Sequence, residues 1–472
     1  MAAIMVQGCT SSAGKSLVVA ALARIYARRG VAVAPFKGQN MSNNARAVEG
    51  GEIGTAQWMQ AKAAGITPQT RMNPVLIKPE AGGSQVIRNG IVDPVAGNLD
   101  WRERSSSLWT TVKGALHSLM SEFDLVVIEG AGSPAEPNLW DRDIANMRVA
   151  EEADAPVLLT VDIDRGGAFA HLYGTWATLP PQHQNRLAGF ILNKFHGDAT
   201  LLEPAPATTA NMTGMRHLGT LPWIEHSLPD EDNSFYASRS FRQDVTTVAI
   251  IRWPTISNLD EFAQLSQVVN IEWAERPDQL LGADMIILPG SKHVVSDLAW
   301  FRARGFEDRL IERADAGVPI LGICGGMQIL GEHIVDPCGV DGSGQGIALL
   351  PLTTTFEEAK HVAQVHLQFA AVQGRWSGLS DLAFDGYDIR HGRTTLNTAD
   401  QVQAILPNNA GFVKDNVLGI ATHGLLENQS ALSVLFGAAS TESFDAVLDR
   451  VADITEEALD MDTIDKLAGS PC

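Results

Sequence analysis

A glycine-rich turn near the start of the chain carries the residue types that bind phosphate groups. The segment GCTSSAGKS at 8–16 follows an apolar run and precedes a stretch with helical periodicity. Backbone N–H groups in such a turn wrap phosphate oxygens, Lys15 would neutralise their charge, and the Ser16 hydroxyl suits Mg²⁺. The two glycines bracket five residues, one more than in the usual phosphate loop, so a plain small-residue turn is the alternative interpretation. The residues expected to bind nucleotide in this turn are Gly8, Ser12, Gly14, Lys15 and Ser16.

Three later apolar runs end in polar side chains. Glu129 ends one run and Asp162 ends the next, so each lies at the sheet edge where parallel α/β folds bind their ligands. With Ser16, we expect Glu129 and Asp162 to hold Mg²⁺, although an aspartate at this point also caps helices. Asn193 ends the third run and is expected to contact the nucleotide. His196 breaks the guanine-type N-K-x-D pattern, which points away from GTP.

Cys324 lies in a tight strand-to-helix turn in the second half of the chain. The segment PILGICGGMQ at 319–328 surrounds it with small residues, which present a side chain outward near a helix N-terminus. Both features favour a nucleophilic thiolate, and a buried structural cysteine is the alternative. His423, directly after another short apolar run, is the expected base. The backbone N–H groups expected to form the oxyanion hole are those of Gly290 or Ser291 and of Gly325.

The composition excludes several classes of protein. The 472 residues contain 35 Lys and Arg against 55 Asp and Glu, and the resulting net charge of −20 disfavours nucleic acid as a partner. No apolar run approaches the roughly 18–20 residues that would span a bilayer, and the first residues lack the charged region of a signal peptide. The four cysteines form no C-x-x-C pair, so neither a disulfide framework nor a structural zinc site is expected. We therefore expect a cytoplasmic protein that binds neither nucleic acid nor membrane.

Parallel sheets must position these side chains, and the chain carries the pattern for two. Continuous apolar runs indicate strands buried on both faces, and the stretch 15–29 indicates a helix between the first two of them. We expect an α/β fold with a doubly wound parallel sheet in each half, followed by a mixed sheet and a helix pair. The expected strands are 4–7, 31–36, 125–128, 157–161, 187–193, 247–251, 285–288 and 319–323, and the expected segments are 1–225, a linker at 226–245, 246–435 and a helical tail at 436–472.

Taken together, these motifs resemble the cobyric acid synthases, which are glutamine-dependent amidotransferases of adenosylcobalamin biosynthesis. The resemblance extends from about residue 3 to residue 430 and is specific in combination. The longer phosphate loop is similar to that of dethiobiotin synthetase, a relative of the N-terminal domain, in which a strand-end lysine contacts substrate. The further blocks that carry the resemblance are Phe36–Asn43, Glu52–Gln57, Met72–Pro79, Asp162–Gly167, Leu288–Lys292 and Gly386–Gly392.

The resemblance implies two active sites. The 1–225 domain would be a dethiobiotin-synthetase-like P-loop domain that uses ATP and Mg²⁺, and the 246–435 domain would be a flavodoxin-like class I glutamine amidotransferase. The second would hydrolyse L-glutamine through a Cys324 thioester, and its ammonia would attack a carboxylate that the first has phosphorylated. The implied corrinoid substrate is adenosylcobyrinic acid a,c-diamide, amidated at its b, d, e and g side chains to give adenosylcobyric acid. A homo-oligomer is compatible with the sequence, and Lys37, Gln39 and Asn40 are the residues expected to contact this substrate.

The chain departs from triad glutaminases next to its histidine. Those enzymes commonly orient the histidine with a glutamate two residues later, where this chain has Leu425. Glu427 lies four residues away and cannot be assumed to replace it. We therefore expect a Cys324–His423 dyad, oriented by backbone or water.

Three other functions fit parts of this pattern. Cobyrinic acid a,c-diamide synthase has the same two-domain layout but a different substrate, and the blocks at 36–43 and 72–78 argue against it. A nucleotide-switched scaffold with an inert glutaminase fold would release no glutamate. An ammonia-only ligase with a decayed glutaminase is disfavoured because Cys324 and His423 are both present.

Overall fold

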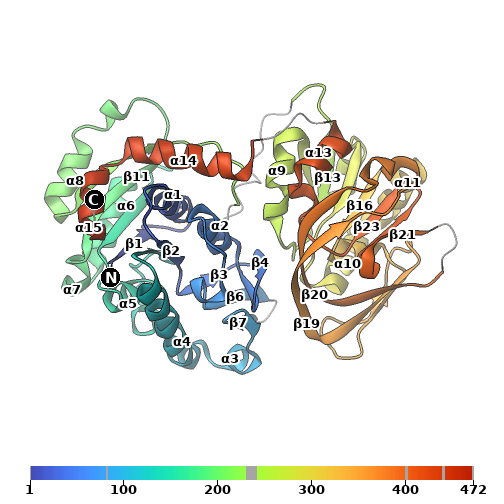
Figure 1. Ribbon diagram of the computed structural model, residues 1–472, viewed down its shortest axis with the longest axis horizontal. Helices are drawn as coiled ribbons and strands as arrows, with labels where there is room; N and C mark the ends of the chain where they lie inside the picture. Colours follow the sequence, from blue (N-terminus) through green and yellow to red (C-terminus); the bar gives the residue numbers. More distant parts are fainter. Residues whose placement is uncertain (1, 81–82, 230–241, 399–401, 438–441, 470–472) are drawn as a thin grey trace. The chain divides into compact units, whose positions relative to one another are not determined.

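The chain divides into two units. Residues 1–232 and 442–472 form the first unit, and residues 233–441 form the second. The computed structural model describes residues 2–80, 83–229, 242–398, 402–437 and 442–469 (Figure 1). The linker expected at 226–245 falls largely on 230–241, which lie outside the described residues. Within the described part of the chain, no helix is long and apolar enough to cross a bilayer.

The first unit is built on a six-stranded sheet whose strands all run parallel. The glycine-rich turn at 8–16, which is predicted to bind phosphate and is called the phosphate-binding turn below, follows the strand β1, which lies between the strands that end in Glu129 and Asp162. The predicted doubly wound parallel sheet is therefore confirmed. In spatial order the strands are β12 (Arg216–Pro222), β11 (Leu187–Phe195), β10 (Val157–Asp162), β1 (Ala2–Gly8), β9 (Leu125–Glu129) and β2 (Val33–Phe36).

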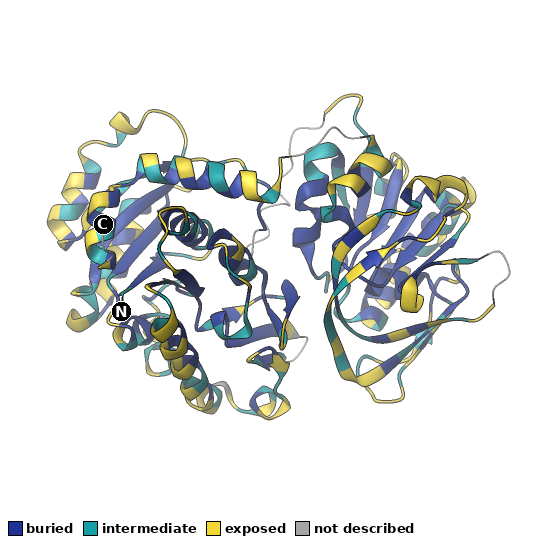
Figure 2. Cartoon of the chain, in the orientation of Figure 1, coloured by how far each residue is buried: buried dark blue, intermediate teal, exposed yellow. Residues whose placement is uncertain are grey.

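Both faces of this sheet are covered by helices, because successive side chains of a strand point to opposite faces. In β1, Met5 packs into the core beneath α4 (Trp101–Glu122) and α6 (Ala168–Thr178), whereas Ile4 packs into the core beneath α1 (Lys15–Arg28). Figure 2 shows the strands dark blue and the outer helix faces yellow. The other α-helices among residues 2–229 are α2 (Thr55–Ala63), α3 (Pro94–Asn98), α5 (Met147–Glu152), α7 (Pro181–Gln184) and α8 (Ala205–Thr213).

A small sheet between β2 and α3 was not expected from the sequence. Its strands are short and its buried side chains include charged ones, so apolar periodicity does not reveal it. Lys78 forms a buried ion pair with Glu52, and the Arg46 guanidinium lies 4.6 Å from the ring centre of Trp58. The strands are β3 (Gln39–Met41), β6 (Val75–Glu80), β7 (Gly83–Arg88) and β8 (Ile91–Val92), beside the hairpin of β4 (Ala45–Val48) and β5 (Gly51–Gly54).

The second unit has a seven-stranded sheet in which five parallel strands follow the flavodoxin-like order 2-1-3-4-5. Two antiparallel strands extend its edge. The expected fold class is thus confirmed for this half as well. The order is β14 (Asn270–Ala274), β13 (Thr247–Ile251), β15 (Met285–Leu288), β16 (Ile320–Ile323), β23 (Val417–Ile420), β22 (Gly411–Lys414) and β21 (Gln403–Leu406).

Helices cover both faces of this sheet too, and a second sheet stands beside it. The long antiparallel strands β19 (Leu352–Gln368) and β20 (Ala383–Leu396) account for most of the mixed sheet expected after residue 350. β19 also pairs with β17 (His333–Val335), which pairs with β18 (Gly344–Gln345). The helices are α9 (Phe262–Val268), α10 (Val294–Ala303), α11 (Phe306–Asp315), α12 (Gly325–Leu330) and α13 (Gln429–Phe436).

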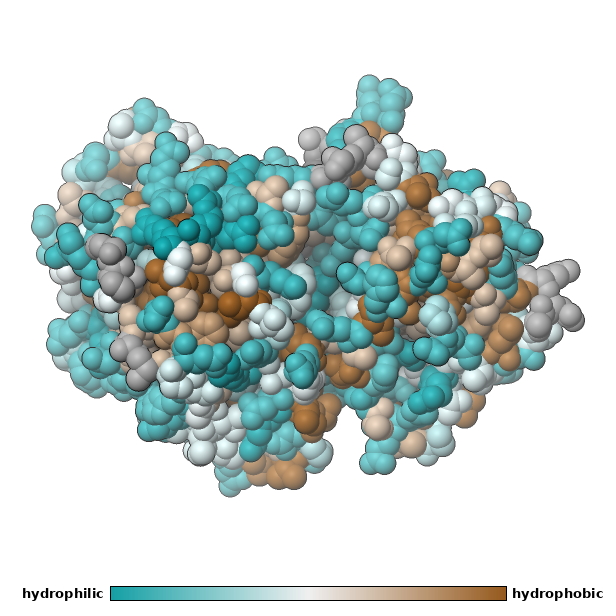
Figure 3. All heavy atoms as spheres, in the orientation of Figure 1, coloured by the Kyte–Doolittle hydropathy of each residue, from teal (hydrophilic) through white to brown (hydrophobic). Residues whose placement is uncertain are grey.

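The last two helices, α14 (Phe444–Ala458) and α15 (Met461–Ala468), return to the first unit. Leu448 and Ile464 are buried in the same core as α1. On the helix surface, Arg24 of α1 pairs with Asp449, and Arg29, just after α1, pairs with Asp465. The C-terminal segment therefore completes the layer that covers the phosphate-loop helix. On the face drawn in Figure 3, hydrophilic residues predominate and apolar residues lie in scattered patches between them.

Leu448→Ala should destabilise the first unit, because Leu448 is 1% exposed beneath α1. Removing a buried leucine side chain costs about 2–5 kcal/mol of unfolding free energy. Urea unfolding followed by circular dichroism measures this loss. The matched control is Leu201→Ala, since Leu201 is 81% exposed in the same unit, and its effect should stay within about 0.5 kcal/mol. Equal effects of the two variants would show that α14 is not part of the core.

Candidate active sites

The phosphate-binding turn is held in shape by contacts that only a glycine at 14 permits. Gly14 has φ 89°, and a Cβ there would lie 2.0 Å from Nδ2 of Asn193. That Nδ2 donates a hydrogen bond to the Ala13 carbonyl at 2.9 Å, and Oδ1 of Asn193 accepts one from Lys194 N at 2.9 Å. Asn193 thus braces the turn through Nδ2, while Oδ1 is held by the backbone of its own strand, β11.

Two lysine side chains, one from the turn and one from β11, donate hydrogen bonds to carbonyl groups of the turn. Lys15 is buried, and its Nζ donates to the Thr10 carbonyl at 3.4 Å, so the ammonium group folds back over the turn. A Cβ at Gly8 would lie 2.6 Å from that carbonyl oxygen and 3.1 Å from Lys15 Nζ. On the other side, Lys194 Nζ donates to the Ser12 carbonyl at 2.7 Å. The turn is therefore closed and bears two ammonium groups, which suits it to a polyanion.

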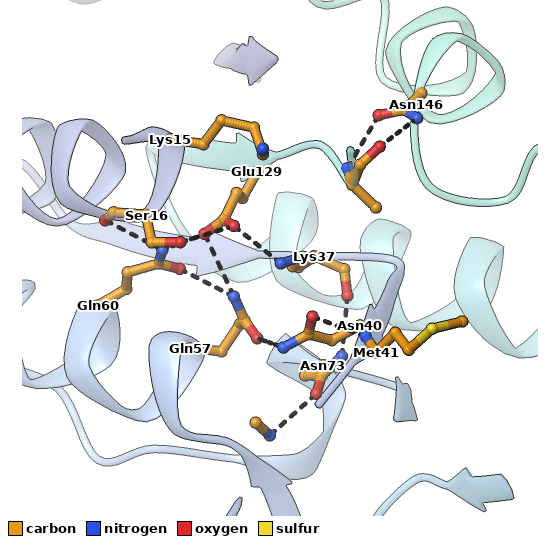
Figure 4. Close-up of polar contacts among 12 residues, drawn as sticks. Lys15, Ser16, Lys37, Asn40, Met41, Gln57, Gln60, Asn73, Glu129 and Asn146 are labelled. Atoms are coloured by element: carbon orange, nitrogen blue, oxygen red, sulfur yellow. Dashed lines mark hydrogen bonds and ion pairs between the residues drawn. The ribbon is translucent and has the colours of Figure 1, made fainter. Parts of the chain in front are cut away.

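Glu129 is the centre of a buried polar cluster at the start of α1. Its Oε1 accepts hydrogen bonds from Ser16 Oγ at 2.9 Å and from Lys37 Nζ at 2.8 Å (Figure 4). Its Oε2 accepts from Gln60 and, at 3.4 Å, from Gln57. Burial alone raises the pKa of Glu129, but the charge and hydrogen bond of Lys37, the Gln60 bond and the charge of Lys15 outweigh it, so the pKa lies below its usual value. Glu129 is an ionised carboxylate with no exposed surface.

Three elements bring this cluster together. Glu129 ends β9, Lys37 directly follows β2, and the two glutamines lie one turn apart on α2. The roles of Gln57 and Gln60 were not predicted from the sequence, although their helical i, i+3 spacing places both on one face. Asn40 Nδ2 donates to Gln57 Oε1 at 3.1 Å, which links this cluster to β3.

The candidate metal-binding residues fall into two groups. Ser16 and Glu129 are in direct contact, whereas Asp162 accepts from Lys194 Nζ at 3.2 Å and lies 3.4 Å from Arg165 Nε. No group of three or more His, Cys, Asp or Glu side chains suited to a metal occurs among the described residues. A hydroxyl beside one carboxylate fits Mg²⁺, because this ion takes few protein ligands and fills its other positions with phosphate oxygens and water.

The three residues expected to contact substrate lie in the segment that follows β2, and they face two adjoining places. Lys37 pairs with Glu129 and Asn40 with Gln57, while Gln39 lines a cavity of about 1040 Å³. That cavity also reaches the phosphate-binding turn at Thr10 and Ser11. The structure therefore brings two of the three into the Glu129 cluster and the third to an adjoining cavity.

In the second unit, Cys324 occupies the sharp turn between β16 and α12. Its backbone has φ 51° and ψ −107°, a strained conformation that is typical of a nucleophile elbow. The turn is tightly enclosed, because a Cβ at Gly326 would lie 1.9 Å from the Leu288 carbonyl oxygen. Cys324 N donates to the Ile420 carbonyl at 2.7 Å, which ties the elbow to the neighbouring strand β23.

His423 follows β23 and lies close enough to Cys324 for the charge of the sulfur to act on the imidazole. Its ring stacks on Tyr387, with ring centres 5.2 Å apart, and its Nδ1 lies 3.1 Å from Oε1 of Glu261. Glu261 and His423 are 0% and 1% exposed, and Oε2 of Glu261 also accepts from Gly424 N at 3.5 Å. The expectation that backbone or water orients His423 is therefore wrong, since a buried carboxylate 162 residues earlier does so. No local spacing in the sequence could have indicated it.

This arrangement favours a charged imidazole. Burial alone lowers the pKa of His423, but the charges of Glu261 and Cys324, together with their hydrogen bonds, raise it well above 6.5. An imidazolium between a sulfur and a carboxylate can hold a proton ready for a leaving group.

The residues expected to form the oxyanion hole are brought together as neighbours of this sulfur. The Gly290 carbonyl accepts from Trp253 Nε1 and from Ser257 N, both at 3.1 Å. Because a trans peptide is planar, the N–H of Ser291 points the opposite way. A Cβ at Gly325 would lie 2.8 Å from Ser291 N, so the first N–H of α12 adjoins it. These two backbone groups can bind an oxyanion.

Comparison with known proteins gives matches to both halves and to the whole. Residues 4–234 match the family described as CobQ/CobB/MinD/ParA nucleotide binding domain, and residues 247–431 match the CobB/CobQ-like glutamine amidotransferase domain. The cobyric acid synthase of Variovorax paradoxus (strain S110) is 50% identical over 462 residues, which cover 96% of each chain. That of Polaromonas naphthalenivorans (strain CJ2) is 50% identical over 465 residues, covering 95% of this chain and 96% of the relative.

Glu261→Gln should lower the pKa of His423, because it removes the nearby negative charge that favours the imidazolium. We expect a fall of at least about one pH unit in the midpoint of the His423 signal, measured by NMR on ¹³C-histidine-labelled protein. His423→Asn assigns the signal. Glu358→Gln, an exposed position in the same unit, should leave the midpoint unchanged. A midpoint equal in the wild type and in Glu261→Gln would contradict the assigned contact.

Proposed function

The chain belongs to the cobyric acid synthase family of glutamine-dependent amidotransferases that act in cobalamin biosynthesis, and we propose from this membership which reaction it performs. It amidates the b, d, e and g side-chain carboxylates of adenosylcobyrinic acid a,c-diamide to give adenosylcobyric acid, using ATP, Mg²⁺ and glutamine. The observation that carries the proposal is the 50% identity over 96% of the chain. The geometry of the two candidate sites supports a chemical route for it.

The second unit would release ammonia from glutamine. The Cys324 sulfur attacks the amide carbon, and the developing oxyanion is bound by the N–H groups of Ser291 and Gly325. His423 gives its proton to the departing nitrogen, which leaves as ammonia and a thioester remains. Water, deprotonated by the now neutral His423, then hydrolyses the thioester to glutamate. Glu261 keeps the imidazole in one orientation and one tautomer throughout.

The first unit would make the acceptor carboxylate electrophilic. A carboxylate is a poor electrophile at neutral pH, so one of its oxygens attacks the γ-phosphorus of ATP and ADP leaves. Ammonia then attacks the acyl carbon and phosphate departs, which leaves an amide. Lys15 would neutralise charge on the transferred group. Ser16 and Glu129 would hold Mg²⁺, which supplies further charge neutralisation when bound.

Mass spectrometry of the corrinoid product tests the proposal directly. The wild type, given the a,c-diamide with ATP and glutamine, should replace four carboxylic acid groups by amides in succession. No corrinoid product, or amidation that stops at another number, would refute the assigned reaction.

Cys324→Ala should separate the two half-reactions. It removes the nucleophile, so glutamine-dependent amidation and glutamate release should fall by at least about 10³-fold. Amidation with a high concentration of ammonium salt should persist, because ammonium supplies the nitrogen without the second unit. Cys338→Ala, at an exposed free thiol of the same unit, is the matched control and should behave as the wild type. Loss of ammonium-dependent activity in Cys324→Ala would argue for a structural role of the thiol.

Lys15→Ala should abolish amidation with either nitrogen source, because the ammonium group lies over the turn that would hold the phosphates. We expect ATP-dependent phosphate release to fall by at least about 10²-fold, measured in the presence of corrinoid and ammonium. Glutamate release should remain measurable. Lys113→Ala, which removes a surface ion pair with Glu152 in the same unit, is the control. Amidation that persisted in Lys15→Ala would refute the assignment of this turn to ATP.

A further inference from the structure

The large cavity of the first unit adjoins the phosphate-binding turn. Its volume is about 1040 Å³, slightly above the range of roughly 300–1,000 Å³ typical of small-molecule sites. Its walls come from segments that are far apart in sequence: the turn at Thr10 and Ser11, strands β3 and β6, helices α4 and α6, and the loop 131–146. A molecule in this cavity would therefore lie directly against the site assigned to ATP.

The wall chemistry suits a large molecule with an apolar body and a polar rim. Met41, Ile77, Leu139 and Trp140 supply apolar surface, and Met41 is 61% exposed. Amide and hydroxyl groups lie among them. The polar residues include Gln39, Ser84, Ser105, Asn146, Thr175 and Thr178. A corrin macrocycle, with apolar faces and a periphery of amides and carboxylates, matches this mixture.

Arg104, on α4, is the most informative residue of the wall. Its guanidinium donates to Ser84 Oγ at 2.7 Å and to the carbonyls of Gly97 at 3.4 Å and Leu99 at 3.3 Å, all of them neutral acceptors. Its Nε is buried and has no acceptor among the described residues. No carboxylate pairs with Arg104 in that part of the chain.

Several other arginines of the unit do have a carboxylate partner. Arg24, Arg29 and Arg71 each pair with an aspartate or glutamate. A partly buried guanidinium satisfied only by neutral groups retains its full charge, and an incoming carboxylate would form charge-assisted hydrogen bonds with it. The cavity thus carries an anion site at its wall.

We propose that this cavity is the corrinoid-binding site and that Arg104 binds a peripheral carboxylate of the corrinoid. The inference rests on the proposed function, which supplies the polycarboxylate substrate. One carboxylate reaches the phosphate-binding turn for reaction while another, on the same macrocycle, is held by Arg104. The alternative anion, a nucleotide phosphate, is an outcome that the experiment distinguishes.

Arg104→Gln should raise KM for adenosylcobyrinic acid a,c-diamide by about 10- to 100-fold, the effect of losing a charged hydrogen bond. KM for ATP and the rate of glutamate release should stay within about twofold of the wild type. Arg102→Gln is the matched control, because Arg102 is an exposed arginine on the same helix and lines no part of the cavity. A raised KM for ATP with an unchanged KM for corrinoid would assign Arg104 to the nucleotide instead and overturn the proposal.

A second variant tests the cavity independently of charge. Gly174 lines the cavity on α6, and a Cβ there meets no atom within 4 Å, so the side chain of Gly174→Phe has room to start at this wall and is intended to take up part of the cavity. Equilibrium dialysis should show at least tenfold weaker binding of the a,c-diamide, measured by its visible absorbance. Gly114→Phe, at an exposed and equally open helical glycine outside the cavity, should bind it as the wild type does.

These outcomes separate the inference from its premise. If the wild type fails to amidate the a,c-diamide, the proposed function is refuted. If the wild type amidates it, but Arg104→Gln and Gly174→Phe keep their affinity for it, the corrinoid binds outside this cavity. The proposed reaction then stands, and the proposed binding site is refuted.

Discussion

A carboxylate with no exposed surface must be met by donors from its own chain, and each candidate site is built around one. Glu129 accepts hydrogen bonds from Ser16, Lys37, Gln57 and Gln60, and Glu261 accepts them from His423 and Gly424. Removing one partner of a buried ion pair costs about 3–5 kcal/mol, since the remaining charge is left uncompensated. The donors around each glutamate are therefore held in place by the same interactions that keep the fold together.

A buried glutamate needs donors from distant parts of the chain, and such donors meet at strand ends, where both sites lie. The carboxyl ends of parallel strands gather turns from distant parts of the chain at one edge of a sheet. Glu129 ends β9 beside the turn that follows β1, and Cys324 and His423 follow the adjacent strands β16 and β23. Helix N-termini meet the same edges, so backbone N–H groups are available to a phosphate in one unit and to an oxyanion in the other.

The sequence predicted the parts of the structure that depend on local pattern. The strands β13 and β15 have the expected bounds, and α1 begins at the expected residue, because apolar runs and a glycine-rich turn report directly on buried strands and helix starts. The sequence did not reveal the sheet β3–β8, whose short strands bury charged side chains such as Lys78. Glu261 was missed for another reason. Its contact with His423 depends on how the segment before α9 packs, and nothing near Leu425 encodes it.

Arg104 and Glu129 are both charged side chains, and they differ in whether the protein itself provides an oppositely charged partner. Glu129 has its full set of donors within the protein, so it organises the site even before any ligand arrives. Among the described residues Arg104 has only neutral acceptors, at a cavity wall, so an anion in that cavity would compensate its charge. A substrate with several carboxylates can satisfy such a residue with one group while it presents another for reaction. The reacting group then need not supply the binding energy itself, and this energy can serve to position the macrocycle against the phosphate-binding turn.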